Sequence, residues 1–234
     1  GTDLQAWALQ VPVLAKHFRV ITYDNRGAGR TGAPDRPYSI AQMAEDANAL
    51  LDELGIPSAH VLGFSMGVYI AQELVLAHPT KVDKLILLAT APDIDGDGRT
   101  IVKNMIEVRR TNMSREQVAR NNAPFLYSPE LLDDEERFER GIQNNLANPY
   151  AQQDHAFIRQ AQAILGFDAK DRLVGLFRLC ASAGLLKRKS QFTQNIGIVG
   201  EAFPGSFERI DRAREITFPA ITLANTQIDS ASLR

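Results

Sequence analysis

The chain has 234 residues, of which 44% are hydrophobic and 23% charged, so it is long and apolar enough for one α/β domain with a sizeable core. Its formal net charge of −2 argues against a nucleic-acid-binding surface or a polybasic membrane anchor. The single cysteine, Cys180, excludes an internal disulfide framework and a multi-thiolate metal site. No apolar run approaches the roughly 20 residues of a membrane-spanning helix, and no leader pattern opens the chain, so we expect a cytoplasmic protein.

The first half alternates short β-branched runs with helical patterns, which is typical of βαβ units. Apolar residues recur at helical spacing in 4–14, 40–54 and 66–77, and Ser39 with Gln42 forms a capping box that predicts a helix start. Strands are expected at 18–23, 59–64 and 82–88. Because parallel neighbours joined by helices need crossover connections, this pattern predicts an α/β fold with a doubly wound, mostly parallel sheet.

The composition changes after the third expected strand. Polar helical segments punctuated by Pro124, Pro129 and Pro149 fill residues 93–165, where we expect a helical lid inserted over the sheet. Beyond it, only 196–199 and 221–223 suggest strands. The predicted organisation is a core at 1–92, a lid at 93–165, and a return helix with an atypical tail at 166–234.

The candidate nucleophile lies in Gly63-Phe-Ser-Met-Gly67, where a predicted strand ends and a predicted helix begins. In such a turn the serine backbone is strained and the flanking glycines avoid collisions with the neighbouring strand and helix. Ser65 would then project at the carboxyl ends of the strands, and the Met66 N–H at the helix start would face a developing oxyanion. The alternative is a serine that merely caps the helix.

Together with Tyr23-Asp-Asn-Arg-Gly-Ala-Gly-Arg-Thr31, this turn resembles the α/β-hydrolase fold, in the esterase and lactonase branch that includes 3-oxoadipate enol-lactonases. The resemblance is strong over residues 1–92, and residues 167–173 resemble the helix that returns from the lid to the sheet. It implies a loop near the site, in which stabilisation of the loop is a more probable role than catalysis; its residues are Asp24, Arg26, Gly27 and Gly29.

The resemblance also implies hydrolysis of a small carboxylic ester or lactone through an acyl-enzyme on Ser65, with no cofactor. The expected partner is that small-molecule substrate, with no nucleic acid and no membrane. The competing interpretation is a catalytically inactive fragment, or a non-catalytic member of the same fold that binds small ligands.

An acyl-transfer serine needs a histidine base and an acid that orients it, and in this family they follow the serine in the order acid, then histidine. The chain has four histidines, and none follows His155. We expect the other three, His17, His60 and His78, at surface or helix-end positions. His155, in the lid, is then the candidate substitute base, and Asp93, just beyond the third strand, is the candidate acid.

The chain also begins after the point where the family's His-Gly turn would lie. These two departures lead to the hypothesis that the sequence is truncated at its N-terminus and divergent or frame-altered at its C-terminus.

Two weaker patterns in the sequence have both a functional and a structural interpretation. Residues 93–98 match the opening of a calcium loop, but Asn104 stands where a bidentate glutamate is required, so we predict a solvated turn and no metal. Apolar lid residues could line an acyl pocket or only pack within the lid; they are Phe125, Leu126, Phe138 and Phe157.

Overall fold

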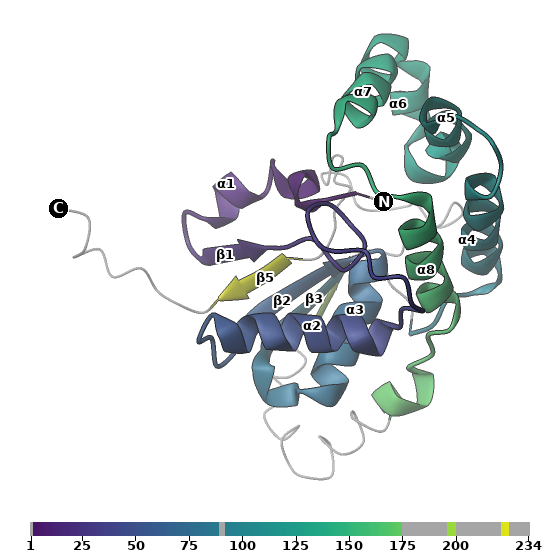
Figure 1. Cartoon of the computed structure of the whole chain (residues 1–234). Helices are drawn as coiled ribbons and strands as arrows, with labels where there is room; N and C mark the ends of the chain where they lie inside the picture. Colours follow the sequence, from purple (N-terminus) through teal and green to yellow (C-terminus); the bar gives the residue numbers. More distant parts are fainter. Residues whose placement is uncertain (1, 89–91, 175–195, 200–220, 225–234) are drawn as a thin grey trace. The chain divides into compact units, whose positions relative to one another are not determined.

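The structure is a computed structural model that describes residues 2–88, 92–174, 196–199 and 221–224 (Figure 1). The chain divides into two compact units. One is a sheet unit that contains residues 4–23, 39–93 and the chain from 167 onward, and the other is a helical unit of residues 94–166 together with 24–38 and the N-terminal residues before Leu4. The predicted boundaries of core, lid and tail stay a prediction.

The sheet has five strands in the order β1-β5-β2-β3-β4. They are β1 (Arg19–Thr22), β2 (Ala59–Phe64), β3 (Val82–Leu88), β4 (Ile196–Val199) and β5 (Ile221–Ala224). The strand β3 is parallel to both β2 and β4, whereas β5 is antiparallel to β1 and β2. The three strands expected in the first half therefore run in one direction, as predicted, and β5 lies between two of them in the opposite direction.

Alternate residues of a strand point to opposite faces, and the core clusters show that both faces of this sheet are covered. On one face Trp7 packs against Val20, Leu62 and Phe64. This face is covered by η1 (Leu4–Trp7) and α1 (Val11–Leu14). On the other face Leu51 packs against Ile21 and Ala59. The fold is thus a sheet between helical layers, as the α/β pattern predicts.

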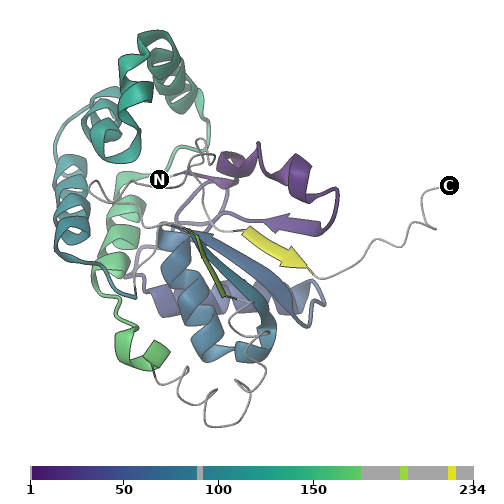
Figure 2. The same cartoon turned by 180° about the vertical axis from the view of Figure 1, so that it is seen from behind.

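The second face carries two longer helices. They are α2 (Ile40–Glu53) and α3 (Met66–Ala77), which lie against each other, and α3 packs on β2 and β3 (Figure 2). The hydroxyl of Ser39 accepts the N–H of Gln42 at 3.1 Å and starts α2 as predicted. Residues 4–14 form two short helices, because Pro12 lies in the first turn of α1 and has no N–H with which to continue the preceding helix.

The expectation of a surface or helix-end position is wrong for His60, which is buried in β2. Its Nδ1 lies 3.0 Å from the Asp83 carboxylate, at ion-pair distance but outside hydrogen-bond geometry, and its ring meets the edge of Phe18. The pairing of β2 with β3 shifts register at Ala59 and His60, beside Asp83. A register shift depends on the partner strand, which explains why the local sequence does not reveal this burial.

The helical unit contains five helices among the described residues. They are α4 (Gly96–Arg109), α5 (Arg115–Leu126), α6 (Pro129–Asp133), α7 (Glu135–Ala147) and α8 (Asp154–Leu165). The calcium-like stretch forms the start of α4, where the Asp95 carboxylate accepts the N–H of Gly98 at 2.7 Å. The stretch is therefore the capped start of a helix, with Ile94 buried, and not the solvated turn that the sequence predicts. No helix in the described ranges is long and apolar enough to cross a bilayer.

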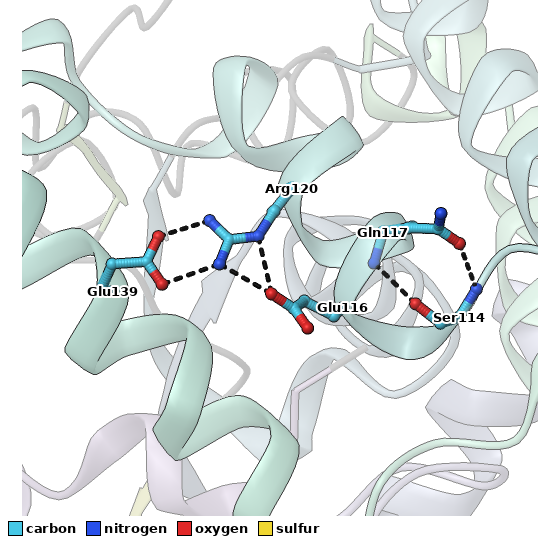
Figure 3. A network of polar contacts seen from close by, with 5 residues as sticks. All are labelled: Ser114, Glu116, Gln117, Arg120 and Glu139. Carbon is cyan, nitrogen blue, oxygen red and sulfur yellow. Dashed lines mark hydrogen bonds and ion pairs between the residues drawn. The ribbon is translucent and has the colours of Figure 1, made fainter.

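A polar network joins α5 to α7 (Figure 3). The Arg120 guanidinium donates to both carboxylate oxygens of Glu139, at 2.5 and 2.7 Å, and to Glu116 one turn earlier in its own helix. In the same turn of the helix as Glu116, Ser114 and Gln117 form a reciprocal capping box that begins α5. The network therefore ties the well-capped start of one helix to the middle of another.

Replacing Arg120 with glutamine is expected to raise the pKa of Glu139. Hydrogen bonds from Arg120 hold this pKa below its usual range. A carboxyl group with a folded-state pKa below its unfolded value adds stability above the unfolded pKa, and this stability is lost as the pH falls through the folded pKa. A carboxyl ¹³C titration of Glu139 measures the effect. Arg140→Gln is the control, because Arg140 pairs with Glu136 in the same helix; an unchanged titration in Arg120→Gln would contradict the assignment.

Candidate active site

Ser65 occupies the single position between β2 and α3, and its backbone is strained. Its φ of 52° and ψ of −122° make it the only non-glycine residue with a positive φ in the part of the chain that the structure describes. Such a conformation costs about 1–3 kcal/mol for a residue with a side chain and persists where the surroundings enforce it, often at functional sites. The predicted tight turn is therefore present.

The side chain of Ser65 is exposed and makes no capping hydrogen bond, although Ser65 is the N-cap residue of α3. At four other helix starts the N-cap side chain accepts a backbone N–H three residues later; these caps are Ser39, Asp95, Ser114 and Asp134. The interpretation of Ser65 as a mere helix cap is therefore wrong. Its hydroxyl projects from the turn without serving the helix.

Backbone hydrogen bonds anchor this turn to the sheet. Ser65 N–H donates to the carbonyl of Leu88 at the end of β3, at 3.3 Å, and Val68 N–H donates to the Ser65 carbonyl at 2.9 Å. Met66 is the first residue of α3, and the first N–H groups of a helix have no acceptor within it. The positive end of the helix dipole adds to the pull of this amide on an anion. One turn thus places a hydroxyl and an anion-attracting amide next to each other.

Gly63 is required by close packing within the same turn. A Cβ added there would lie 2.3 Å from the carbonyl oxygen of Gly67 and 2.9 Å from the backbone nitrogen of Val68. Both contacts are with backbone atoms, which cannot move aside as the end of a side chain can. The glycine predicted before the serine therefore has its expected steric role.

Replacing Ser65 with glycine is expected to stabilise the chain by about 1 kcal/mol, because glycine adopts a positive φ without strain and loses only part of this gain to its greater unfolded-state entropy. Urea denaturation monitored by circular dichroism measures the change. The same variant is expected to lose any nucleophilic reactivity of residue 65. A variant less stable than the parent would show that the surroundings do not force strain on Ser65.

Part of the loop after β1 behaves as the resemblance implies. Asp24 is buried, its carboxylate accepts the N–H of Arg30 at 2.9 Å, and its carbonyl accepts the Thr31 hydroxyl at 2.6 Å. The guanidinium carbon of Arg26 lies 5.9 Å from the centre of the Tyr38 ring. Asp24 therefore stabilises the loop backbone, and one contact of the Arg26 side chain is with the Tyr38 ring.

Side chains in and just before α8 hold this loop through contacts that the sequence did not reveal. Gln152 and Gln160 donate their side-chain amides to the carbonyls of Gly27 and Arg26, at 2.8 and 2.7 Å. A Cβ on Gly27 would meet Tyr38 at 2.9 Å. Gln152 precedes the start of α8 and Gln160 lies within this helix. No sequence motif distinguishes either glutamine from its neighbours.

Replacing Gly29 with alanine is expected to lower the free energy of unfolding by about 2 kcal/mol. Gly29 has a φ of +53°, and an added Cβ would lie 2.2 Å from the Asp24 carboxyl carbon. The matched control is Gly32→Ala in the same loop, where no atom lies within 4 Å of the added Cβ. Urea denaturation of both variants measures the difference, and equal stability would contradict the close packing of Gly29 on Asp24.

No described interaction joins Asp93, the predicted acid, to Ser65, and the predicted base His155 belongs to the helical unit. Asp93 Oδ2 forms an ion pair with Lys170 Nζ at 2.7 Å, and His155 is exposed in the first turn of α8. His17 is exposed, and His78 pairs with Glu45 at the end of α3, so both fit their expected positions. The catalytic roles of Asp93 and His155 stay predictions. The described residues contain no group of three His, Cys, Asp or Glu side chains arranged to hold a metal ion.

The apolar residues of the helical unit differ in exposure. Phe125 and Leu126 are about half exposed, at 47% and 50%. Phe138 and Phe157 are partly buried, each below a guanidinium, with Arg120 at 5.8 Å and Arg109 at 4.6 Å from the ring centres. Packing within the helical unit therefore accounts for the second pair.

Comparison with known proteins agrees with this geometry. The sequence profile of the alpha/beta hydrolase fold family matches residues 1–162. The chain is 31% identical to the 3-oxoadipate enol-lactonase 2 of Acinetobacter baylyi over 65% of its own length and 56% of the relative. It is also 31% identical to the putative carbamate hydrolase RutD of Azorhizobium caulinodans, over 73% of this chain and 63% of the relative.

Solved structures give the same result. The enol-lactonase from Burkholderia xenovorans LB400 superposes with a TM-score of 0.64 at 29% identity, covering 73% of this chain and 64% of that one. A hydrolase from Pseudomonas aeruginosa has a TM-score of 0.64 at 30% identity, with 74% and 63% covered. The matched region spans less than two thirds of each of these four proteins. With the family profile over more than half of its length and the strained strand-to-helix serine in place, the chain belongs to the alpha/beta hydrolase fold family.

Proposed function

We propose that this chain acts as a serine hydrolase on a small carboxylic ester or lactone, with Ser65 as the nucleophile. The observation that carries the proposal is the strained, exposed Ser65 whose side chain does not cap its own helix. The names of the relatives, a lactonase and a putative carbamate hydrolase, support hydrolysis at an acyl carbon.

In the proposed reaction, Ser65 Oγ attacks the carbonyl carbon of the substrate while a base removes the hydroxyl proton. The carbonyl oxygen becomes an oxyanion that accepts a hydrogen bond from Met66 N–H. When the C–O bond breaks, the proton passes to the leaving alkoxide or enolate, and an ester on Ser65 remains. A water molecule then attacks this acyl-enzyme, and the carboxylic acid leaves. Substrate and water supply every atom, so no cofactor enters the proposal.

His155 as the base and Asp93 as the acid belong to the same proposal. Asp93 would have to exchange its ion pair with Lys170 for a histidine. Each role has its own test, because His155→Gln or Asp93→Asn should slow acylation of Ser65 about a hundredfold or more if the residue serves the nucleophile.

Reaction of the full chain with a fluorophosphonate tests the nucleophile directly. We expect one phosphonyl adduct, located on Ser65 by peptide mass spectrometry, and turnover of p-nitrophenyl acetate. A chain that is folded by circular dichroism but carries no adduct on Ser65 would refute the proposal. That outcome would favour the competing function, a non-catalytic member of the fold that binds small ligands.

A further inference from the structure

The segment Phe167–Leu173 lies against the helix that begins at the candidate nucleophile. The Arg172 guanidinium binds both carboxylate oxygens of Glu73 in α3, each at 2.8 Å. The Phe167 ring packs on Tyr69 of the same helix, with ring centres 5.2 Å apart. Two side chains of one short segment thus hold two successive turns of α3.

The residues of α3 that make these contacts lie on the same face of the helix as Met66, its first residue. Met66, Tyr69 and Glu73 are spaced by three and four positions, so their side chains share one face of the helix. A contact at Glu73 therefore acts on the same side of the helix as Met66, and a tilt of α3 about Glu73 would move the Met66 amide.

The same segment is also attached to the chain beyond β3. Ala169 N–H donates to the Pro92 carbonyl at 3.0 Å, Asp168 forms an isolated backbone bridge with Asp93, and Lys170 pairs with the Asp93 carboxylate. The last residue of β3, Leu88, accepts the N–H of Ser65. The segment therefore contacts both the helix that begins after Ser65 and the chain at Pro92 and Asp93, a few residues beyond β3.

Arg172 supplies the positive charge that faces the Glu73 carboxylate. Glu73 is buried, at 8% exposure, and a buried carboxylate is stable as an ion only when a cation and hydrogen bonds compensate it. A guanidinium is suited to this task, because its planar fork binds two carboxylate oxygens at once and fixes their direction. Without Arg172 the helix would carry an uncompensated buried charge.

We propose that Arg172 is a positioning residue, which holds α3 through Glu73 and so fixes the Met66 amide and Ser65 for acylation. The inference rests on the proposed function of Ser65. Arg172 touches no reacting atom in this scheme and acts only through the helix.

The test compares Arg172→Gln with Arg140→Gln in the full chain. Arg140 also binds a glutamate at 2.8 Å, but on the exposed face of α7, so the control removes the same charge and the same type of contact. We expect fluorophosphonate labelling of Ser65 to be about tenfold slower in Arg172→Gln, because small displacements of reacting groups are costly, and unchanged in Arg140→Gln. For p-nitrophenyl acetate, the loss should be in kcat, with KM little changed.

Two further readouts separate positioning from a general loss of fold. Methylguanidinium at millimolar concentration should restore part of the labelling rate in Arg172→Ala and leave the parent chain unaffected. Amide hydrogen exchange in the first turn of α3 should be faster in Arg172→Gln than in the parent or in Arg140→Gln. If Arg172→Gln does not fold, Arg172→Lys replaces it. We expect Arg172→Lys to be labelled at Ser65 more slowly than the parent, but by less than tenfold.

The outcomes distinguish this inference from the proposed function. A folded Arg172 variant that labels at the parent rate would overturn the positioning role while leaving Ser65 as nucleophile. If the parent chain itself is not labelled, the proposed function fails. The hydrogen-exchange measurement then still tests whether Arg172 holds α3. Unchanged exchange in α3 would then show that Arg172 does not hold the helix.

Discussion

Replacing Ser65 with alanine is expected to reduce hydrolysis of p-nitrophenyl acetate by about a thousandfold or more and to abolish the fluorophosphonate adduct. The substitution removes the only atom that can form the acyl bond in the proposed reaction. The Met66 amide and the fold remain, because alanine can occupy the same turn. Initial rates and intact-mass spectra of the two chains measure the effect.

The matched control for this prediction is Ser128→Ala. Ser128 is also an N-cap serine whose side chain makes no capping hydrogen bond, but its φ is −71°, an unstrained value. We expect its substitution to leave the rate within twofold of the parent. Hydrolysis retained in Ser65→Ala would show that another group carries the reaction, and the strain at Ser65 would then have no catalytic meaning.

Replacing Gly63 with alanine is expected to lower the free energy of unfolding by about 3 kcal/mol or more, and to abolish labelling of Ser65. The added methyl group would lie 2.3 Å from the Gly67 carbonyl oxygen, so β2 and α3 must separate. Separation moves the turn that holds both Ser65 and Met66. Denaturation in urea and the labelling rate measure the two effects on the same samples.

Gly141→Ala provides the contrast. Gly141 lies within α7, and no atom lies within 4 Å of a Cβ added there. Alanine is favoured over glycine in a helix by about 0.5–1 kcal/mol, so this variant should be slightly more stable than the parent. A Gly63→Ala chain as stable as the parent would mean that the turn is looser than its backbone distances indicate.

Local patterns in the sequence were sufficient to predict the elements around the site. The strands at 59–64 and 82–88 and the helix at 66–77 have the predicted bounds in the structure. Each of these segments has a clear period, and each is bounded by glycine, proline or a change of period. The strained serine follows from the same information, because strand, glycine, serine and helix succeed one another without room for a longer turn.

Contacts between distant segments could not be predicted in the same way. Arg172 and Glu73 are 99 residues apart, and neither is distinguished by its neighbours. The antiparallel position of β5 between β1 and β2 also depends on which strand edges are open, and no period within 221–224 encodes that choice. The prediction of a surface or helix-end position for His60 is wrong for a related reason, since its burial depends on the strand beside it and on Phe18.

For this protein the sequence by itself determined the class of fold, the elements that flank Ser65 and the serine chemistry to be tested. These follow from short-range effects, namely residue period, helix capping and the steric freedom of glycine. Only the tertiary structure decided that the Ser65 hydroxyl does not cap its helix, that Asp93 is paired with Lys170, and that Arg172 pairs with Glu73 in α3. The two ion pairs depend on which side chains of distant segments come within a few ångströms of each other, and no local pattern in the sequence encodes those partners.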